Sequence, residues 1–383
     1  MGLLLRNARA VLPGTVRLCD VRIRDGRIAE IATHLLPLEG EDVRDCARAI
    51  LMPGWIDTHN HGGLSHGFYM EDADLCAIAD SYARRGTTAI LPTLSCMPEE
   101  RFAAAARRLV SFARRQSSGA KFVGIHAEGP FLNPIRHGGM IKEYIAAPDC
   151  ARLERMIDAC GGMLRILTLA PEMDDADALI REALACGVSV SAGHTNATYE
   201  EMLHAISAGL SRMTHTFNAC RPFSHRDPGV LGAALQDPRI TCEVIGDFAH
   251  LHPATVKMIL SVKGSSGITL ISDYSDGKGY AAKGEGKHQT EDGTPYTVRG
   301  GVAWSESGGV MGNANDMAVS VRNLRTLSVP LYEIAEMASA NPAKAAGIFE
   351  TTGSIAAGKA ADLVLCEDDL TPIAVYVDGI PVR

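Results

Sequence analysis

Residues 55–61 read WIDTHNH, a short strand candidate that ends in a His-x-His pair. Seven further strand candidates follow it, and helical patterns or loops separate them. The eight candidates are Trp55–Asn60, Thr87–Leu91, Phe122–Ala127, Leu164–Leu169, Val188–Ala192, Arg212–Phe217, Thr241–Ile245 and Gly267–Ser272. The helical patterns are Ala73–Arg85, Glu99–Arg115, Ala176–Cys186, Tyr199–Ala208 and Pro253–Val262. Eight strand–helix units in tandem predict an α/β fold, a (β/α)8 TIM-like barrel.

An open, doubly wound sheet is the alternative arrangement of such units. That fold typically carries a GxGxxG turn that opens the helix after its first strand, and no such turn occurs here. The barrel is therefore favoured. The glycine-rich stretch Tyr274–Gly312 shows no clear helical pattern and is too long for a plain connector, so we expect a loop that covers the site.

Both ends of the chain have the pattern of β-structure. Residues 3–8 and 21–23 form short strands beside an Asp25-Gly26 turn, and residues 362–365 and 373–377 form strands beside Asp378-Gly379. Chain termini often lie close together. We therefore predict a small β-sandwich domain built from residues 1–54 and 347–383, with the barrel at 55–346. Two unrelated edge elements are the alternative.

The composition excludes several classes of protein. Of the 383 residues, 46% are hydrophobic and 21% are charged, which argues against disorder. The net charge of −8 argues against sequence-independent nucleic-acid binding, which needs a basic surface. No apolar run reaches the roughly 18 residues of a membrane helix, and we identify no secretory signal, so a cytoplasmic protein without membrane partners is expected. The ten cysteines contain no CxxC pair, which favours reduced core residues over a cysteine-zinc site.

The ends of the predicted strands carry histidines and carboxylates. In a parallel barrel, active residues sit at the C-terminal ends of the strands. Those positions here are His59, His61, Glu128, His194, His215 and Asp273. His59 and His61 are two residues apart and project from the same face of a strand. A single strand histidine is commonly a hydrogen-bonded core residue, but matching residues on several strands favour a site for a divalent metal.

Several segments carry a family resemblance. Residues 53–62, PGWIDTHNHG, resemble the opening strand of the amidohydrolase superfamily, and Asn341–Ala345, Gly353–Ile355 and Gly358–Val364 resemble its C-terminal end. More narrowly, the chain resembles the family of N-acetylglucosamine-6-phosphate deacetylases over nearly its whole length. The segments that carry this resemblance are residues 66–72, 86–88, 91–93, 126–133, 191–197, 214–219 and 225–229.

The resemblance implies one or two divalent ions. Glu128, His194 and His215 would bind the main metal, and His59 and His61, with Glu128 bridging, would bind a second. Zinc is expected, with iron or manganese as alternatives, because all three accept histidine and carboxylate. Such an ion lowers the pKa of its water to about 7 and polarises a carbonyl oxygen.

The resemblance also implies roles for residues that move a proton and bind substrate. Asp273 would take a proton from the water and deliver it to the leaving amine; a turn or helix-cap role is the alternative reading of this residue. Asp247 and Asp276 are weaker candidates for proton transfer. The substrate would be a phosphorylated amino sugar, and the protein a homodimer. The implied phosphate contacts are Asn218 and Ala219, through their backbone amides, Arg226 and His250.

The chain departs from the family pattern where the acetyl group would bind. The family usually has a Gly-Ala-His or Gly-Thr-His segment after the glutamate motif, whereas this chain has Met140 in place of that histidine. His137, at a different position, is a candidate to compensate. Residues 274–275 and 308–313 also differ from the pattern. These changes leave the metal chemistry intact and leave open the exact sugar and acyl group.

Two other functions are compatible with part of this pattern. An amidohydrolase of another N-acyl or cyclic amide commonly carries a modified lysine at the end of strand 4, where this chain reads Leu169-Ala170-Pro171-Glu172. A metal-stabilised barrel that only binds a ligand would not need Asp273, since pure binding requires no proton transfer. Both considerations favour a metal-dependent deacetylase.

Overall fold

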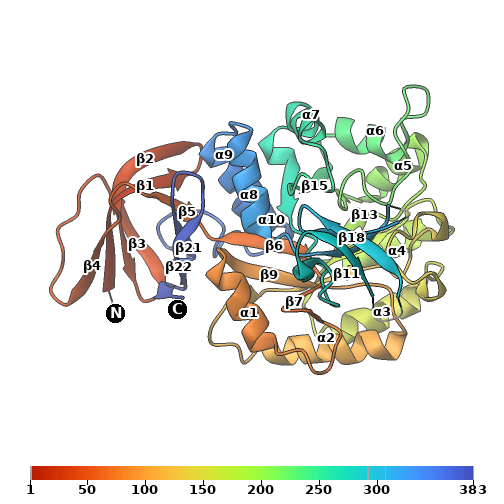
Figure 1. Cartoon of the computed structure of the whole chain (residues 1–383), viewed down its shortest axis with the longest axis horizontal. Helices are drawn as coiled ribbons and strands as arrows, with labels where there is room; N and C mark the ends of the chain where they lie inside the picture. Colours follow the sequence, from red (N-terminus) through yellow and green to blue (C-terminus); the bar gives the residue numbers. More distant parts are fainter. Residues whose placement is uncertain (1, 291–292, 307, 383) are drawn as a thin grey trace.

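A parallel barrel forms the main body of the computed structural model, which describes residues 2–290, 293–306 and 308–382 (Figure 1). Its strands are β6 (Trp55–Asn60), β9 (Thr87–Leu94), β10 (Lys121–Phe122), β11 (Ile125–Glu128), β12 (Leu164–Leu169), β13 (Ser189–Ala192), β14 (Arg212–Met213), β15 (Thr241–Ile245) and β16 (Ile268–Ile271). β10 and β11 both pair with β9 and together make the third strand. Neighbouring strands pair in parallel in the order of the sequence, as predicted.

The barrel closes between its last and first strands, β16 and β6. The Asp273 N–H donates to the His59 carbonyl at 2.9 Å, and the His61 N–H donates to the Tyr274 carbonyl at 2.7 Å. Below this seam, the Ser272 hydroxyl and N–H both donate to the buried carboxylate of Asp57. The closing hydrogen bonds therefore bring two expected metal ligands, His59 and His61, next to Asp273.

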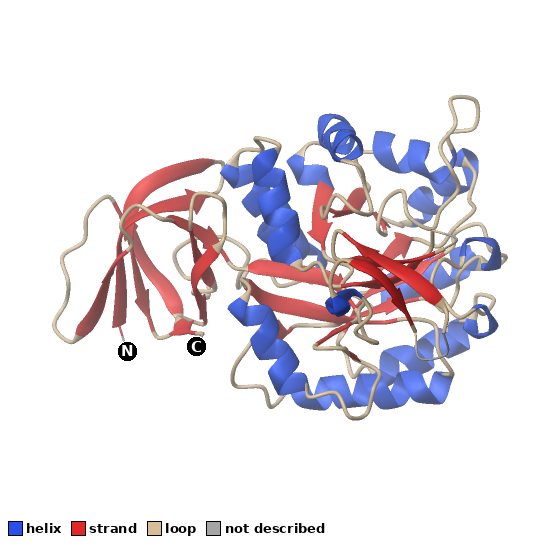
Figure 2. Cartoon of the chain, viewed as in Figure 1, coloured by secondary structure: helices blue, strands red, loops and turns tan. Residues whose placement is uncertain are grey.

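Helices cover the outside of the barrel (Figure 2). They are α1 (Leu75–Arg84), α2 (Glu99–Ala113), α3 (Cys150–Ala159), α4 (Ala176–Ala185), α5 (Tyr199–Ala208), α6 (Gly229–Gln236), α7 (Pro253–Lys263), α8 (Met317–Thr326), α9 (Leu331–Ala335) and α10 (Asn341–Ala345), with a π-helical turn at Glu336–Ala340 and 3-10 turns at Pro134–Arg136, Lys142–Tyr144, Ser265–Gly267 and Ala281–Lys283. The ends of α5 follow from its sequence: Thr198 and Glu201 form a reciprocal cap, and Gly209 ends the helix with φ 112°.

Strands from both ends of the chain pair in one eight-stranded sheet beside the barrel (Figure 1). They are β1 (Gly2–Leu12), β2 (Thr15–Arg24), β3 (Arg27–Ala32), β4 (Glu41–Asp45), β5 (Ile50–Pro53), β21 (Leu363–Cys366), β22 (Pro372–Val377) and β23 (Ile380–Pro381). β5 and β21 join the two ends, with Leu51 opposite Leu365. Hydrogen bonds connect these strands into a single sheet. Its division into the two layers of a sandwich, and the domain boundaries at 54/55 and 346/347, stay predictions.

Alternating side chains on β5 and β21 face two different cores. Leu51, Leu363 and Leu365 belong to the core of the terminal sheet. Their neighbours Ile50 and Val364 belong to the large core shared with the barrel. This period of two is that of a strand buried on both faces. The sheet therefore packs directly against the barrel.

An ion pair between a partly exposed lysine and a buried aspartate also links the sheet to the barrel. Lys121 Nζ, on β10, lies 2.7 Å from Asp362 Oδ2 and 2.9 Å from Asp378 Oδ1. The Asp362 carboxylate also accepts from the Thr352 hydroxyl at 2.6 Å and from the Asp378 N–H at 2.9 Å. The Asp362 carbonyl accepts from the Gly54 N–H at 2.8 Å, one residue before the first barrel strand.

A four-stranded antiparallel sheet occupies the stretch where we expected a loop. Its strands are β17 (Gly286–Gln289), β18 (Pro295–Arg299), β19 (Val302–Ser305) and β20 (Val310–Asn313), and a small hairpin of β7 (Gly62–Gly63) and β8 (His66–Gly67) lies between β6 and α1. The Asn313 side chain donates to the Ser272 and Asp273 carbonyls at 2.9 and 3.2 Å. The expectation of a loop was wrong, but the segment does lie beside the mouth of the barrel (Figure 1).

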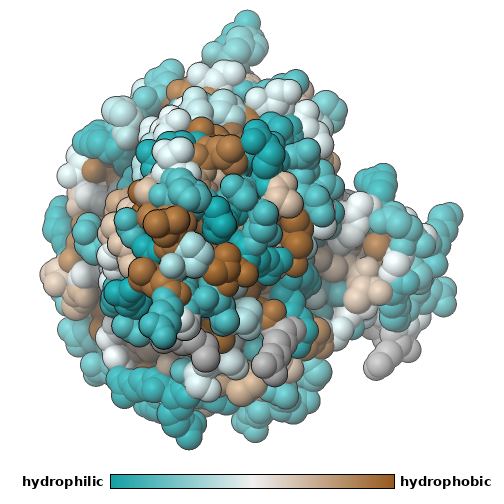
Figure 3. Space-filling view, turned by 90° about the vertical axis from the view of Figure 1, so that its left-hand side faces the viewer, coloured by the Kyte–Doolittle hydropathy of each residue, from teal (hydrophilic) through white to brown (hydrophobic). Residues whose placement is uncertain are grey.

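The surface seen in Figure 3 is mostly hydrophilic, with hydrophobic side chains in small groups. Within the described ranges, no helix combines the length and the apolar character that crossing a bilayer requires. The ten cysteines, all of them described, are unpaired, in keeping with the expectation of reduced residues.

Candidate metal centre

Six side chains from five barrel strands meet at one end of the barrel. His59 lies in β6 and His61 just after it, and Glu128 is the last residue of β11. His194, His215 and Asp273 each stand two residues beyond their strands, β13, β14 and β16. All six are therefore at C-terminal strand ends, and the structure brings together the five expected metal ligands and Asp273.

Three of these residues form a compact group. The Nε2 atoms of His194 and His215 each lie 3.0 Å from Glu128 Oε1. The two Nε2 atoms are 3.1 Å from each other. Ligand atoms around a tetrahedral zinc ion lie roughly 3.3 Å apart, given metal–ligand distances of about 2.0–2.1 Å. The group has the dimensions of three ligands of one ion.

A second group shares Glu128 with the first. His59 Nε2 lies 3.4 Å from Glu128 Oε1, and His61 Nε2 lies 3.3 Å from Oε2. Asp273 Oδ1 lies 3.3 Å from His61 Nε2 and 3.7 Å from His59 Nε2. Glu128 stands between two pairs of histidines, which is the placement that a bridging carboxylate requires.

In His194 and His59, the hydrogen bond made by Nδ1 determines which ring nitrogen carries the proton. His194 Nδ1 lies 3.0 Å from the Arg136 carbonyl, and His59 Nδ1 lies 3.1 Å from the Glu243 carboxylate. Both partners only accept, so Nδ1 is the donor in each ring. In their neutral forms, His194 and His59 therefore point the Nε2 lone pair toward Glu128.

The converging atoms fit a cation. Within the described part of the chain, His59 Nε2 and Glu128 Oε2 are buried without a hydrogen bond. Protonating both His194 and His215 at Nε2 would place two hydrogens in the 3.1 Å between these nitrogens. A divalent ion accepts all the lone pairs at once, and imidazole and carboxylate are ligands that zinc, iron and manganese share.

The electrostatics of the site favour positive charge at its centre. Burial raises the pKa of Glu128, but the adjoining histidines outweigh it and hold the pKa well below the ordinary value. Burial lowers the pKa of His59, yet the Glu128 and Asp273 carboxylates raise it overall. By contrast, burial lowers the pKa of His126 to about 3, so this neighbouring ring is neutral.

Unusual backbone conformations aim the ligands inward. His194, His215 and Asp273 have φ of 47°, 27° and 50°, in the left-handed region that non-glycine residues seldom adopt. The predicted strand 212–217 therefore ends at Met213, because the chain turns at His215. Gly138, with φ 57°, passes so close that a Cβ there would lie 3.1 Å from His194 Cε1. Such strain is typical of functional sites.

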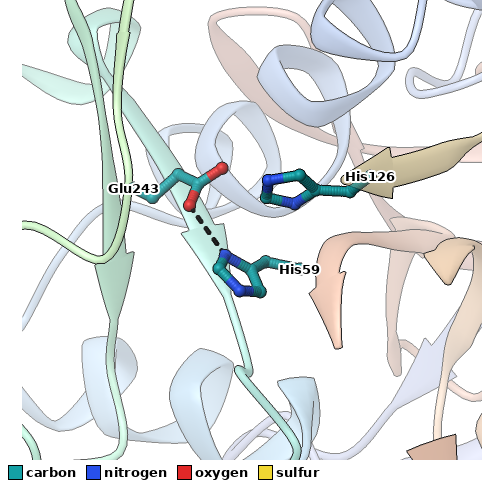
Figure 4. A group of neighbouring side chains, drawn as sticks. All are labelled: His59, His126 and Glu243. Atoms are coloured by element: carbon teal, nitrogen blue, oxygen red, sulfur yellow. Dashed lines mark hydrogen bonds and ion pairs between the residues drawn. The ribbon is translucent and has the colours of Figure 1, made fainter. Parts of the chain in front are cut away.

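The sequence analysis missed the residues that support the ligands. Glu243 and Arg212 lie inside barrel strands, and Ser95 Oγ lies 3.0 Å from His61 Nδ1. Figure 4 shows Glu243 and His126 pointing toward His59 from two other strands. A signal was present, since Glu243 interrupts an otherwise apolar strand, TCEVI, and charged residues are rarely fully buried without a partner.

Two of the expected substrate contacts lie in the turn after His215. The Asn218 N–H donates to the His215 carbonyl at 2.8 Å, so it is engaged within the turn and does not match the expected role of a free amide. Among the described residues, the Ala219 N–H has no hydrogen bond. Arg226 is exposed on the following loop. Nearby Arg221 is paired with Asp227 at 2.6 Å.

His250 is the expected substrate contact with the most defined setting. Its side chain is 5% exposed, and its Nδ1 lies 2.8 Å from Asp247 Oδ2. Burial lowers the pKa of His250, but the hydrogen bond and charge of Asp247 raise it overall, with a further contribution from Asp273. Trp304 of β19 lies beside the ring, with centroids 6.1 Å apart.

The other candidates have structural partners. His137 Nδ1 lies 3.1 Å from the Met140 carbonyl, which closes the turn that carries both residues. Asp247 is occupied with His250, and Asp276 accepts from the Ala281 and Ala282 N–H groups at 2.9 and 2.8 Å. These contacts leave Asp273 as the carboxylate beside the metal ligands with a partly exposed side chain, at 19%.

The chain is similar to known proteins over most of its length. A sequence model described as the amidohydrolase family matches residues 50–382. The N-acetylglucosamine-6-phosphate deacetylase of Bacillus subtilis (strain 168) is 35% identical over 368 residues, or 94% of this chain and 91% of that protein. The N-acetylgalactosamine-6-phosphate deacetylase of Escherichia coli O157:H7 is 32% identical over 363 residues, or 94% and 93%.

A solved structure is similar over the whole chain. It is an aspartate-to-alanine mutant of N-acetyl-D-glucosamine-6-phosphate deacetylase from Mycobacterium smegmatis, in complex with N-acetyl-D-glucosamine-6-phosphate. Its TM-score is 0.87 at 30% identity, covering 100% of this chain and 99% of that one. The matched ranges include all six converging side chains.

Proposed function

The chain belongs to the amidohydrolase family, as its motifs predicted, and from this premise we propose that it deacetylates a phosphorylated amino sugar. The substrate is N-acetylglucosamine 6-phosphate or a closely related N-acetyl amino-sugar phosphate, and the products are the free amine and acetate. The observation that carries the proposal is the group of converging ligand atoms on Glu128, His194 and His215, with the Asp273 carboxylate beside it.

The metal would be held by the residues that converge. Glu128, His194 and His215 would hold one divalent ion, and His59 and His61 would hold a second with Glu128 as the bridge. Zinc is proposed, with iron or manganese as alternatives. When bound, such an ion lowers the pKa of a coordinated water to about 7 and polarises a carbonyl oxygen.

Asp273 would move the proton. Burial raises the pKa of Asp273, but His59 and His61 outweigh it and lower the pKa overall, so the carboxylate is ionised and ready to accept. It takes a proton from the attacking water as the oxygen adds to the amide carbon. It then gives this proton to the nitrogen as the carbon–nitrogen bond breaks, which releases acetate and the amine.

The phosphate would be bound beyond the metal centre. His250 is held by Asp247, and its raised pKa favours the cationic form that an anion attracts. The Ala219 N–H and Arg226 would add donors, and the Asn218 side chain stands at the same turn. We further propose a homodimer, in which Arg226 serves its own site or that of the neighbouring subunit. His137 and Met140 remain candidates for contacts to the acyl end.

Acetate release tests the proposal. The metal-loaded protein is given N-acetylglucosamine 6-phosphate, N-acetylgalactosamine 6-phosphate and unphosphorylated N-acetylglucosamine in parallel. The galactosamine substrate is included because the relative from Escherichia coli is named for it. We expect turnover of at least one phosphorylated sugar, with a kcat/KM at least about tenfold above that of the free sugar. Absence of acetate from all three substrates would overturn the proposal.

A further inference from the structure

We propose that Glu243, paired with Arg212, is a positioning residue that orders ligands of both halves of the metal centre from inside the barrel. One buried carboxylate would set the protonated nitrogen of His59 and hold the turn that carries His215. The inference rests on the proposed function, because it concerns the same metal centre.

Glu243 connects three barrel strands through four hydrogen bonds. Its Oε2 accepts from His59 Nδ1 at 3.1 Å and from the His215 N–H at 3.3 Å. Its Oε1 accepts from Arg212 Nη2 at 3.2 Å. Its carbonyl accepts from the Thr216 N–H at 2.9 Å. The residue therefore contacts β6, through the His59 hydrogen bond drawn in Figure 4, and both ends of the segment from β14 to the His215 turn.

The contact to His59 bears on the strength of that residue as a ligand. Because the carboxylate only accepts, it keeps the proton on Nδ1 and leaves the Nε2 lone pair for an ion. A carboxylate behind a ligating imidazole also fixes the ring and makes it a stronger donor to the metal. The contact to the His215 N–H supports a backbone that adopts φ 27°.

Arg212 lowers the energetic cost of burying the Glu243 carboxylate in the barrel interior. The side chain of Glu243 is 0% exposed and that of Arg212 is 5% exposed. A lone buried carboxylate would be strongly destabilising, and the guanidinium supplies the opposite charge on the side away from His59. The pair thus presents a charged acceptor to His59 without leaving an isolated buried charge.

A separate metal site at His59, His126 and Glu243 is the competing interpretation of this cluster, whose ligand atoms lie within 4.8 Å of one another. Both nitrogens of His126 are engaged, Nδ1 with the Thr58 carbonyl at 3.1 Å and Nε2 with the Thr168 hydroxyl at 2.8 Å. The Arg212 cation also lies against the carboxylate. These contacts favour a supporting role over a third ion.

The main test replaces the pair and measures metal binding. The double variant Glu243→Leu/Arg212→Met removes the acceptor without leaving an unpaired charge, and such swaps are often neutral for folding. The measurements are the melting temperature of the metal-free protein, the affinity for Zn²⁺ by chelator competition, and the absorption spectrum of the Co²⁺ form. We expect unchanged folding, a 10–100-fold weaker affinity and an altered Co²⁺ spectrum.

Two further variants provide a milder substitution of Glu243 and a matched control. Glu243→Gln preserves shape and should give an intermediate loss of affinity, so it serves if the double variant does not fold. Thr269→Val is the matched control, since Thr269 pairs with Glu243 in register on β16 and its buried hydroxyl has no hydrogen bond within the described residues. We expect wild-type affinity for this control.

The outcomes separate the two proposals. Wild-type affinity and an unchanged Co²⁺ spectrum in folded Glu243 variants would overturn the positioning role while leaving the proposed function standing. A loss of affinity equally large in Thr269→Val would also overturn it, because the effect would then belong to the barrel interior in general. A wild-type protein that binds neither Zn²⁺ nor Co²⁺ would overturn the proposed metal centre itself.

Discussion

The Nε2 atoms of His194 and His215 lie 3.1 Å apart, and both lie 3.0 Å from the same oxygen of Glu128. When both rings are neutral and carry their proton on Nδ1, these three atoms are all acceptors that repel one another, and the His194 ring cannot turn away because its Nδ1 donates to the Arg136 carbonyl. A cation at their centre changes the repulsion into coordination.

Replacing His194 should remove the metal. His194→Ala deletes one ligand of the compact group, so we expect metal content and kcat/KM to fall by more than about 100-fold, beyond the effect of losing an outer partner. Elemental analysis and acetate release measure both. His204→Ala is the matched control, because His204 is exposed on α5 and contacts Asp177 at 2.6 Å. A His194→Ala protein with full metal and normal turnover would refute the ligand role.

Replacing Asp273 should separate metal binding from turnover. Asp273→Asn keeps the shape of the side chain but cannot take a proton, so kcat should fall by roughly 10²–10⁴-fold with metal content retained. Asp276→Asn is the comparison, because Asp276 only accepts hydrogen bonds from the Ala281 and Ala282 N–H groups. Steady-state kinetics measures kcat of both variants, and metal analysis measures their metal content. A near-normal kcat in Asp273→Asn would assign proton transfer to another group.

Replacing Arg226 should affect only phosphorylated substrates. A hydrogen bond to a charged group contributes about 1.5–3 kcal/mol, so Arg226→Gln should lower kcat/KM for the phosphorylated sugar by roughly 10–100-fold. The value for the free sugar should not change. Arg239→Gln provides a control at an exposed arginine whose partner is Asp237. Equal losses with both sugars would mean that Arg226 supports the loop and does not bind phosphate.

Breaking the Lys121–Asp362 pair should weaken the attachment of the terminal sheet. Asp362→Ala removes the buried carboxylate nearest to Lys121, which is partly exposed and keeps its contact with Asp378, so we expect a loss of about 1–3 kcal/mol in the free energy of unfolding. Urea unfolding followed by the fluorescence of buried Trp55 measures the loss. Asp368→Ala, at an exposed residue paired with Arg9, should cost less than about 1 kcal/mol. If Asp362→Ala and Asp368→Ala lower the free energy of unfolding by similar small amounts, the Lys121–Asp362 pair does not stabilise the contact between the terminal sheet and the barrel.

The sequence was most informative at the strand ends. Parallel strands of a closed barrel present their C-terminal ends at one rim, so His59, Glu128 and His194 could be predicted to meet although they are far apart in the chain. Their partners could not be predicted in the same way. Whether Glu243 reaches His59 depends on the tilt and register of β15 and β16, which no local pattern specifies.

The stretch after Asp273 shows another limit of sequence reasoning. Its strands are short, and β17 and β20 lack the apolar alternation that indicates a strand. In β18 the buried Tyr296 and Val298 do alternate with exposed residues, but over only five positions. The prediction that the strand beginning at Arg212 continues to Phe217 was wrong for a different reason. Its composition favours extended backbone, but His215 adopts φ 27° to reach the other ligands.

Anomalous diffraction from crystals of the zinc-loaded protein tests the central claim most directly. With data collected on both sides of the zinc absorption edge, we expect a peak about 2.0–2.2 Å from Glu128 Oε1, His194 Nε2 and His215 Nε2. A second peak between His59, His61 and Glu128 would mark the other ion. Fully loaded crystals without a peak at Glu128, His194 and His215, or with the zinc bound elsewhere, would contradict the account.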